Sequence, residues 1–189
     1  MIVSIINKKG GVGKTSFAFS IAKDLGLFLQ SNDASIIEQI YPNKAKVSPT
    51  LQLIDNCVFD FGGFVDKDVL EICKASDFVI VPCTSLYNAI LRTIETIGEI
   101  KKVNLNIIVL VTDYNSEADK NYILETLQSN FTDIEYFFFK RSKILENAMR
   151  TGASFKELTQ ENALSKMSYA IFFQEYERLL ESLKAKEKK

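Results

Sequence analysis

The chain has 189 residues, of which 47% are apolar, enough for a single domain with a sizeable core. Its formal net charge of −1 gives no overall attraction to nucleic acid, so any DNA contact must come from a local basic patch. The sequence contains no histidine, which excludes Ser-His and Cys-His nucleophilic sites and histidine-ligated metal centres.

Three cysteines, Cys57, Cys73 and Cys83, lie in apolar surroundings without C-x-x-C spacing. We expect them to be reduced and buried rather than to form disulfides, zinc sites or an iron–sulfur bridge. No apolar run reaches the length of a transmembrane helix, and no secretory signal is recognisable. The sequence therefore predicts a cytoplasmic protein whose chemistry depends on lysine, carboxylate, hydroxyl and backbone amide groups.

The first predicted elements are a strand, a glycine-rich loop and a helix. Residues 2–6 are a short apolar run, largely β-branched, which is typical of a buried strand. After Gly13, apolar residues recur at helical spacing. In this order, backbone amides freed by glycine and the helix N-terminus bind phosphate. Lys14 would neutralise the β- and γ-phosphates, and the Thr15 hydroxyl would bind Mg²⁺.

The glycine-rich loop is similar to that of a known family. Lys9-Gly10-Gly11-Val12-Gly13-Lys14-Thr15 resembles the deviant Walker A motif of the ParA/MinD family, ATPases that partition plasmids and chromosomes or position cell-division machinery. Lys8 stands where the general P-loop pattern has its first glycine, a position at which family members tolerate other residues. The resemblance implies ATP and Mg²⁺ as cofactors, bound by these residues and Ser16. It also implies that Lys9 reaches across a nucleotide-sandwich homodimer to the partner's phosphates.

A second short strand is predicted at residues 26–29, before the polar segment Gln30-Ser31-Asn32-Asp33-Ala34. In ParA/MinD proteins the second strand ends in an Asp-x-Asp element whose second carboxylate orients the attacking water. Gln30 and Asn32 match this element if the strand ends at Leu29, and Asp33 fits if the register shifts by one. Asn32 and Asp33 therefore stay alternatives for the catalytic, water-positioning residue. An amide brings no charge and accepts a proton poorly, so the departure from Asp-x-Asp argues against fast hydrolysis.

The next segment carries the predicted magnesium carboxylate. Residues 41–49 contain two prolines and two lysines, which indicates a surface loop. Residues 51–54 and 57–60 are predicted as two strands joined by the turn-prone pair Asp55-Asn56. Asp60 closes the second of these strands, the position at which P-loop proteins hold Mg²⁺ with a Walker B carboxylate. Gly62 and Gly63 follow and would let a backbone amide approach the γ-phosphate.

The rest of the chain repeats the alternation of helices and strands. Strands are predicted at 78–82, 107–111 and 134–139. Helices are predicted at 66–75 and at 85–102. Another helix is expected to begin at a capping box at 116–119 and to end at about residue 129, and a further one to end near residues 151–152. Thr112 and Asp113 follow the strand at 107–111, where related folds contact the nucleotide base. A long terminal helix is expected to pack on the sheet as core through Leu164, Met167, Ile171, Phe172, Leu179, Leu180 and Leu183.

Two basic segments are candidate phosphate contacts. Lys140, Arg141 and Lys143 follow the strand at 134–139, where they could meet phosphates of ATP or of DNA. At the end of the chain, Lys184 and Lys186 are candidates for nonspecific DNA contact. This terminal stretch has a single apolar residue, an alanine, so we expect no membrane insertion. We expect residues 1–183 to form one ATPase domain and residues 184–189 a frayed basic tail.

Strands alternating with helices predict an α/β fold: a single-domain, P-loop NTPase-like, three-layer α/β/α arrangement with a mostly parallel central sheet. The glycine loop lies so near residue 1 that the chain most resembles the small ParA-type ATPases without an N-terminal helix-turn-helix. The resemblance implies a partition ATPase that dimerises with ATP, binds nonspecific DNA, and is reset by slow hydrolysis stimulated by a centromere-binding ParB-type adaptor. Such a protein would be nucleoid-associated when ATP-bound.

The sequence leaves two alternative functions. One is a nucleotide-gated scaffold with little hydrolysis, or a MinD-like positioning protein for a cellular machine, which the departure at Gln30 and Asn32 favours. The other is a metabolic P-loop enzyme, for which no residues indicate a second substrate pocket.

Overall fold

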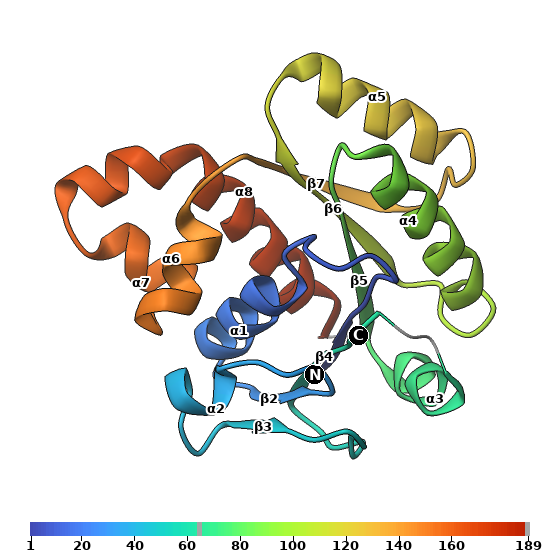
Figure 1. Ribbon diagram of the computed structural model, residues 1–189, viewed down its shortest axis with the longest axis horizontal. Helices are drawn as coiled ribbons and strands as arrows, with labels where there is room; N and C mark the ends of the chain where they lie inside the picture. Colours follow the sequence, from blue (N-terminus) through green and yellow to red (C-terminus); the bar gives the residue numbers. More distant parts are fainter. Residues whose placement is uncertain (64–65, 188–189) are drawn as a thin grey trace.

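A seven-stranded sheet forms the centre of the molecule (Figure 1). The computed structural model describes residues 1–63 and 66–187, with only the backbone described for residues 186 and 187. The strands are β1 (Ile2–Ile5), β2 (Phe28–Ser31), β3 (Ala45–Val47), β4 (Cys57–Asp60), β5 (Phe78–Cys83), β6 (Ile107–Tyr114) and β7 (Glu135–Lys140). Every pairing is parallel, in the order β3-β2-β4-β1-β5-β6-β7. Strand β1 therefore lies between β4 and β5, where the chain changes sides of the sheet and α/β proteins bind ligands.

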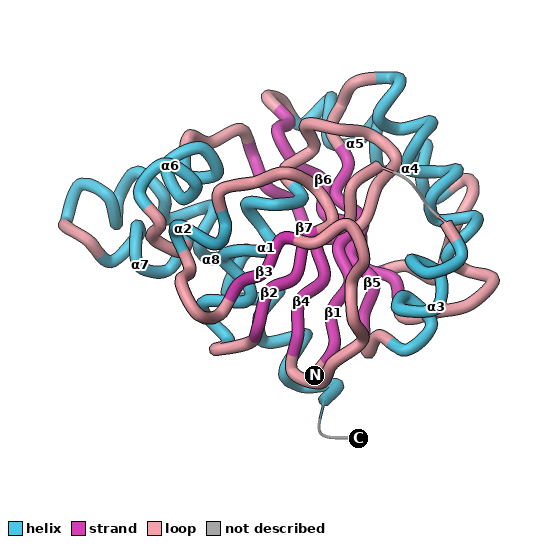
Figure 2. The backbone as a smooth tube through the Cα atoms, turned by 60° about the horizontal axis from the view of Figure 1, so that its bottom comes forward, coloured by secondary structure: helices cyan, strands magenta, loops and turns pink. Residues whose placement is uncertain are grey.

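Helices cover both faces of the sheet (Figures 1 and 2). One face carries α1 (Lys14–Leu25), α2 (Ile37–Ile40), α6 (Ile144–Thr151), α7 (Phe155–Gln160) and α8 (Ala163–Glu187), and the other carries α3 (Lys67–Ala75), α4 (Tyr87–Ile100) and α5 (Glu117–Gln128). Successive strand residues alternate between the two cores: Phe78 and Ile80 face α1 and α8, and Val79 and Val81 face α3 and α4. The unbroken apolarity of the central strands follows from this burial on both faces. The predicted α/β fold and three-layer arrangement are confirmed.

The region between β2 and β4 differs from the sequence prediction. Strand β2 begins at Phe28 and runs to Ser31, two residues later than expected, and a three-residue strand, β3, lies inside the predicted loop 41–49. Residues 51–54 are not a strand. The backbone of Gln52 bonds to the Gln30 side chain at both its N–H and its C=O, at 3.0 and 2.8 Å, instead of to a neighbouring strand. Leu53 and Ile54 are exposed, so apolar composition alone misled the prediction.

The terminal helix also departs from expectation. Phe172, Leu179, Leu180 and Leu183 are buried as predicted, but Leu164, Met167 and Ile171 are 74–78% exposed. These three residues lie in the first turns of α8, beside the α7–α8 turn that projects away from the sheet in Figure 1. Farther along α8, Glu175 accepts a hydrogen bond from the backbone N–H of Phe138 in β7 at 2.8 Å. The apolar repeat therefore continues beyond the part of the helix that contacts the sheet.

Helix α8 continues as helix to Glu187, so residues 184–187 of the predicted tail lie in the helix, and residues 188 and 189 lie outside the described part of the chain. The expected domain boundary at residue 183 stays a prediction. Among the described residues, no helix combines the length and the apolarity of a transmembrane span.

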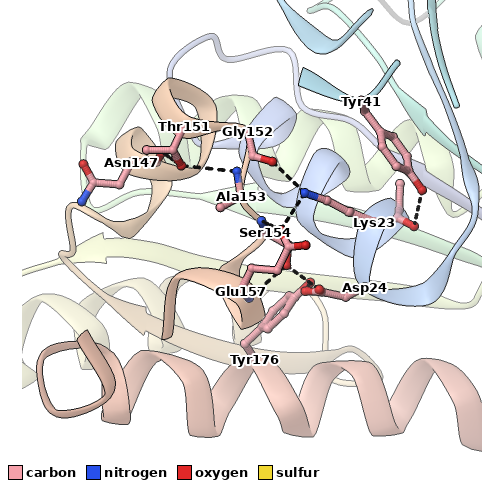
Figure 3. A network of polar contacts seen from close by, with 11 residues as sticks. Lys23, Asp24, Tyr41, Asn147, Thr151, Gly152, Ala153, Ser154, Glu157 and Tyr176 are labelled. Carbon is pink, nitrogen blue, oxygen red and sulfur yellow. Dashed lines mark hydrogen bonds and ion pairs between the residues drawn. The ribbon is translucent and has the colours of Figure 1, made fainter. Parts of the chain in front are cut away.

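A partly buried polar network fastens the end of α1 to the C-terminal helices (Figure 3). Asp24 accepts hydrogen bonds from the Ser154 hydroxyl at 2.5 Å and from the Tyr176 hydroxyl at 3.0 Å. Next to it, Lys23 donates to the carbonyl of Gly152 at 2.7 Å and pairs with Glu157 at 2.6 Å. Burial raises the pKa of the Asp24 carboxyl, against the lowering effect of the two hydroxyls. The helix that begins at the glycine loop is thus anchored at its far end.

Candidate nucleotide site

The loop between β1 and α1 has a backbone that requires glycine. Gly11 and Gly13 adopt left-handed conformations, with φ of +76° and +92°. A Cβ atom at Gly13 would also come within 2.9 Å of the Leu145 side chain. Gly13 is the N-cap of α1, and no side chain of the described residues bonds the free amides of the first turn. An anion at this position would meet backbone N–H groups and the positive end of the helix.

The ammonium group of Lys14 lies within the loop. The residue is 8% exposed, and its Nζ donates a hydrogen bond to the carbonyl oxygen of Lys9 at 3.1 Å. Burial lowers the pKa of Lys14, while the negative charges of Asp60 and Asp33 oppose that change. The cation is therefore held across the loop, where it can exchange its bond to Lys9 for a phosphate oxygen.

Asp60 and Thr15 lie together at the carboxyl end of β4. One carboxylate oxygen, Oδ2, accepts hydrogen bonds from the Thr15 hydroxyl at 2.8 Å and the Ser31 hydroxyl at 3.0 Å. The other oxygen, Oδ1, is buried and has no hydrogen-bond partner among the described residues. Burial raises the pKa of Asp60, against the lowering effect of the two hydroxyls and of Lys14. An orphaned buried oxygen beside a threonine hydroxyl fits a Mg²⁺ ion or a water bound to it.

The rest of a magnesium shell would have to come from nucleotide and water. Within residues 1–63 and 66–187, no group of three acidic or cysteine side chains is arranged to hold a metal ion. Mg²⁺ usually keeps several waters and binds through one or two carboxylates plus substrate phosphates, which agrees with a site of this composition.

Sequence reasoning missed Ser31. Its position beside Asp60 follows from the parallel pairing of β2 with β4, in which Ser31 is the direct partner of Asp60. A strand placed at residues 26–29 cannot show this. The feature of the sequence that could have indicated this contact is the hydroxyl residue at the end of β2, next to the end of the strand that carries Asp60.

The structure separates Asn32 and Asp33, the two candidates for positioning water, from Gln30, the other residue aligned with the Asp-x-Asp element. Gln30 lies inside β2 with its amide bonded to Gln52, so it does not face the loop. Asn32 follows β2, and its Oδ1 accepts a hydrogen bond from the backbone N–H of Gly62 at 2.6 Å. Asp33 is exposed beside Gly62. The amide of Gly62, which the sequence predicts to approach a phosphate, is therefore held by Asn32.

A cavity of about 550 Å³ extends from the glycine loop across the ends of β5, β6 and β7. Thr84 contributes a buried hydroxyl that has no partner among the described residues. Asp113 is the extra residue of a bulge in β6, with φ of +56°, and pairs with Arg141 at 3.6 Å. Irregularities of this kind often direct a side chain toward a site. The cavity wall consists of Gly11, Val12, Gly13, Ser16, Thr84, Thr112, Asp113, Phe139, Lys140, Arg141, Ser142, Lys143, Leu145 and Glu146.

The basic residues predicted for DNA contact do not form one patch. Lys140, Arg141 and Lys143 line the cavity beside the glycine loop. Lys184 instead lies near Met1 and Gly26, at the opposite end of the sheet. The side chain of Lys186 lies outside the described part of the chain.

Comparison with solved structures identifies the fold. Apo McdA of Cyanothece matches with a TM-score of 0.72 and 14% identity, covering 96% of this chain and 98% of McdA. The MinD cell division protein of Aquifex aeolicus matches with a TM-score of 0.63 and 14% identity, covering 89% of this chain and 92% of MinD. A putative plasmid partition protein of Borrelia burgdorferi B31, bound to AMPPNP, matches with a TM-score of 0.60 and 17% identity, covering 92% and 98%.

No protein-family model matches the sequence, and a search of curated proteins found no match. The structural matches nevertheless agree with the resemblance of the glycine loop to the ParA/MinD motif. The chain has the fold shared by McdA, MinD and plasmid partition proteins, with the glycine loop at the central strand of its sheet.

Proposed function

We propose that this chain is a ParA/MinD-type ATPase that binds ATP with Mg²⁺, dimerises around the nucleotide and acts as a partition switch on nonspecific DNA. The observation that carries the proposal is the meeting of Lys14, Thr15 and Asp60 at one end of the sheet, beside a loop that exposes backbone amides. One carboxylate oxygen of Asp60 there has no hydrogen-bond partner in the part of the chain that the structure describes.

Each residue of the site then has a role. Backbone amides of residues 10–16 would surround the phosphates, and Lys14 would contact the β- and γ-phosphates. Thr15 and Asp60 would hold Mg²⁺, which screens phosphate charge when bound. Lys9, at the entrance to the loop, would reach the phosphates of the second subunit. The cavity beside the loop has the volume for a nucleoside.

Binding of a fluorescent, nonhydrolysable ATP analogue tests the site. We expect Mg²⁺-dependent binding by the native chain and its loss in Lys14→Ala. Gel filtration then tests the dimer: the native chain should dimerise with the analogue and be monomeric with ADP, and Lys9→Ala should remain monomeric while still binding the analogue. A native profile for Lys9→Ala would reject the exchanged lysine.

DNA binding is proposed through Lys140, Arg141 and Lys143, because these cations lie at the same end of the sheet as the proposed nucleotide site. Phosphate contacts release counterions, so retention on nonspecific DNA should fall steeply as salt rises. Retention that does not respond to salt would reject this role. Hydrolysis stimulated by DNA and a ParB-type adaptor would then release the protein from the nucleoid.

A second function, a nucleotide-gated scaffold with little hydrolysis, is supported by Asn32. Its amide oxygen is committed to the N–H of Gly62, and it supplies no carboxylate at the end of β2. Turnover in the presence of DNA and adaptor distinguishes the two functions. A rate above that of Lys14→Ala supports the partition switch, and a rate equal to it supports the scaffold.

A further inference from the structure

Asn7 is a fully buried amide between β1 and the glycine loop. Its Nδ2 donates hydrogen bonds to the carbonyl of Pro82 and the hydroxyl of Thr93, both at 2.7 Å. Its Oδ1 accepts a hydrogen bond from the backbone N–H of Lys9 at 2.8 Å. One side chain therefore joins the start of the loop, the end of β5 and helix α4.

These partners specify both the chemistry and the orientation of the side chain. The Pro82 carbonyl can only accept, and the Lys9 N–H can only donate. Thr93 donates its own hydroxyl hydrogen to the carbonyl of Ala89, so toward Asn7 it too accepts. The site requires two donated hydrogen bonds on one side and an acceptor on the other. An amide provides this pattern without charge, whereas a carboxylate would place an oxygen against the Pro82 carbonyl.

Asn7 holds the backbone at Lys9, which also contacts the Lys14 ammonium of the nucleotide site. The N–H of Lys9 is fixed by Asn7, and the carbonyl of Lys9 receives the Lys14 ammonium at 3.1 Å. Lys8 is also attached to α4: its N–H donates to the Thr96 hydroxyl at 3.2 Å, and its ammonium group pairs with Glu99 at 2.6 Å. The entrance of the loop is thus bound to α4, and Asn7 is fully buried in this contact together with Thr93 and Thr96.

We propose that Asn7 is a positioning residue for nucleotide binding: it sets the peptide planes at Lys9, and through them the places of the Lys9 side chain and the Lys14 ammonium. This inference rests on the proposed function, since it concerns the same nucleotide site. Because the Asn7 side chain is fully buried and bonded to protein groups, it would not itself contact the phosphates; its effect is to hold the loop in its binding shape before nucleotide arrives.

The chain contains a closely matched control, Asn104. It is 8% exposed, its Nδ2 donates to the carbonyls of Cys73 and Ser76, both at 2.7 Å, and its Oδ1 accepts from the backbone N–H of Asn106 at 2.8 Å. Both asparagines therefore accept from the residue two positions later and donate twice. Asn104 lies before β6, at the amino-terminal end of the sheet, away from the glycine loop.

The experiment compares Asn7→Ala with Asn104→Ala. Melting temperature and affinity for a fluorescent, nonhydrolysable ATP analogue with Mg²⁺ are measured at a temperature where both variants are folded. We expect both to lose stability, and Asn7→Ala alone to bind the analogue at least about tenfold more weakly.

A milder pair covers the case in which Asn7→Ala does not fold. Thr93→Val removes one acceptor of Asn7, and Thr159→Val removes a buried hydroxyl that donates to the carbonyl four residues earlier in the same way, at 2.8 Å, but touches no loop residue. Thr93→Val should weaken binding about three- to tenfold, and Thr159→Val should leave it unchanged.

The outcomes distinguish a failure of the role of Asn7 from a failure of the proposed function. Native affinity in Asn7→Ala and Thr93→Val, or equal losses in the variants and their controls, would overturn the role of Asn7 and leave the proposed function standing. If the native chain binds no analogue, the proposed function fails and this inference fails with it.

Discussion

Tyr176→Phe isolates one hydrogen bond of the network that anchors α1. Tyr176 is fully buried, and its hydroxyl donates to Oδ2 of Asp24 at 3.0 Å. The substitution removes only the hydroxyl oxygen, so the ring keeps its edge contact with Phe155, whose centroid is 5.1 Å away. A hydrogen bond to a charged group contributes about 1.5–3 kcal/mol, so we expect the free energy of unfolding to fall by about 2 kcal/mol at pH 7. The melting temperature should fall by about 4–8 °C.

The effect should depend on pH in a defined direction. Burial raises the pKa of Asp24 above its ordinary 3.8, so the carboxyl contributes stability that is complete below 3.8 and is lost as the pH rises through the folded pKa. The Tyr176 hydroxyl opposes this loss by bonding to the ionised form. The cost of Tyr176→Phe should therefore be larger at pH 7 than at about pH 4.

Urea unfolding at both pH values measures the effect, and Tyr169→Phe is the control. Tyr169 lies on the same helix, but its hydroxyl accepts from the neutral side chain of Asn147 at 2.8 Å and is only partly buried. We expect the control to cost under about 1 kcal/mol and to show little pH dependence. Equal costs for the two variants at pH 7, or no change with pH for Tyr176→Phe, would refute the reasoning.

The remaining predictions concern the site and its supports. Asp60→Asn should make nucleotide affinity the same with Mg²⁺ and with EDTA, because the ligand for the metal is lost; a retained Mg²⁺ dependence in titrations would contradict this assignment. Gly63→Ala should destabilise the protein by about 1–3 kcal/mol in urea unfolding, since the added Cβ would lie 2.9 Å from the Lys8 carbonyl oxygen. Gly98 is the control: it lies in a helix, and a Cβ added there would have no heavy atom within 4 Å, so Gly98→Ala should stabilise the protein by about 0.5–1 kcal/mol. Lys23→Met should cost no more than about 1 kcal/mol by thermal melting, because Glu157 is 50% exposed; a cost above 2 kcal/mol would show that the pair is a main support of α1.

Much of the fold is predictable from local patterns. Strands such as β5 and β6 are unbroken apolar runs, and such runs are typical of a parallel sheet buried on both faces. The capping box at Ser116 and Asp119 is present and begins α5. The order strand, glycine loop, helix placed Lys14 and Thr15 correctly relative to the sheet, because the motif fixes its own local geometry.

Other features depend on distant residues and could not be predicted. Residues 51–54 look like a strand, but the polar side chain of Gln30, more than 20 positions earlier, takes the hydrogen bonds that a strand would need. The bond of Ser31 to Asp60 depends on the register of β2 against β4. Lys140, Arg141 and Lys143, at and just after the end of β7, become part of the cavity only because β5, β6 and β7 end side by side.

The two outermost strands have consequences for how the molecule behaves in concentrated solution. A free strand edge is a template on which another chain can add, and it is a common route to aggregation. Strand β3 offers only three residues, with the exposed Lys46 in the middle. On β7, the carboxylate of Glu175 occupies the outward N–H of Phe138. The sheet is built from largely apolar strands, but one edge strand is short and carries an exposed lysine, and the other has a backbone N–H bonded to a side chain. Both features disfavour the addition of further strands at the edges of the sheet.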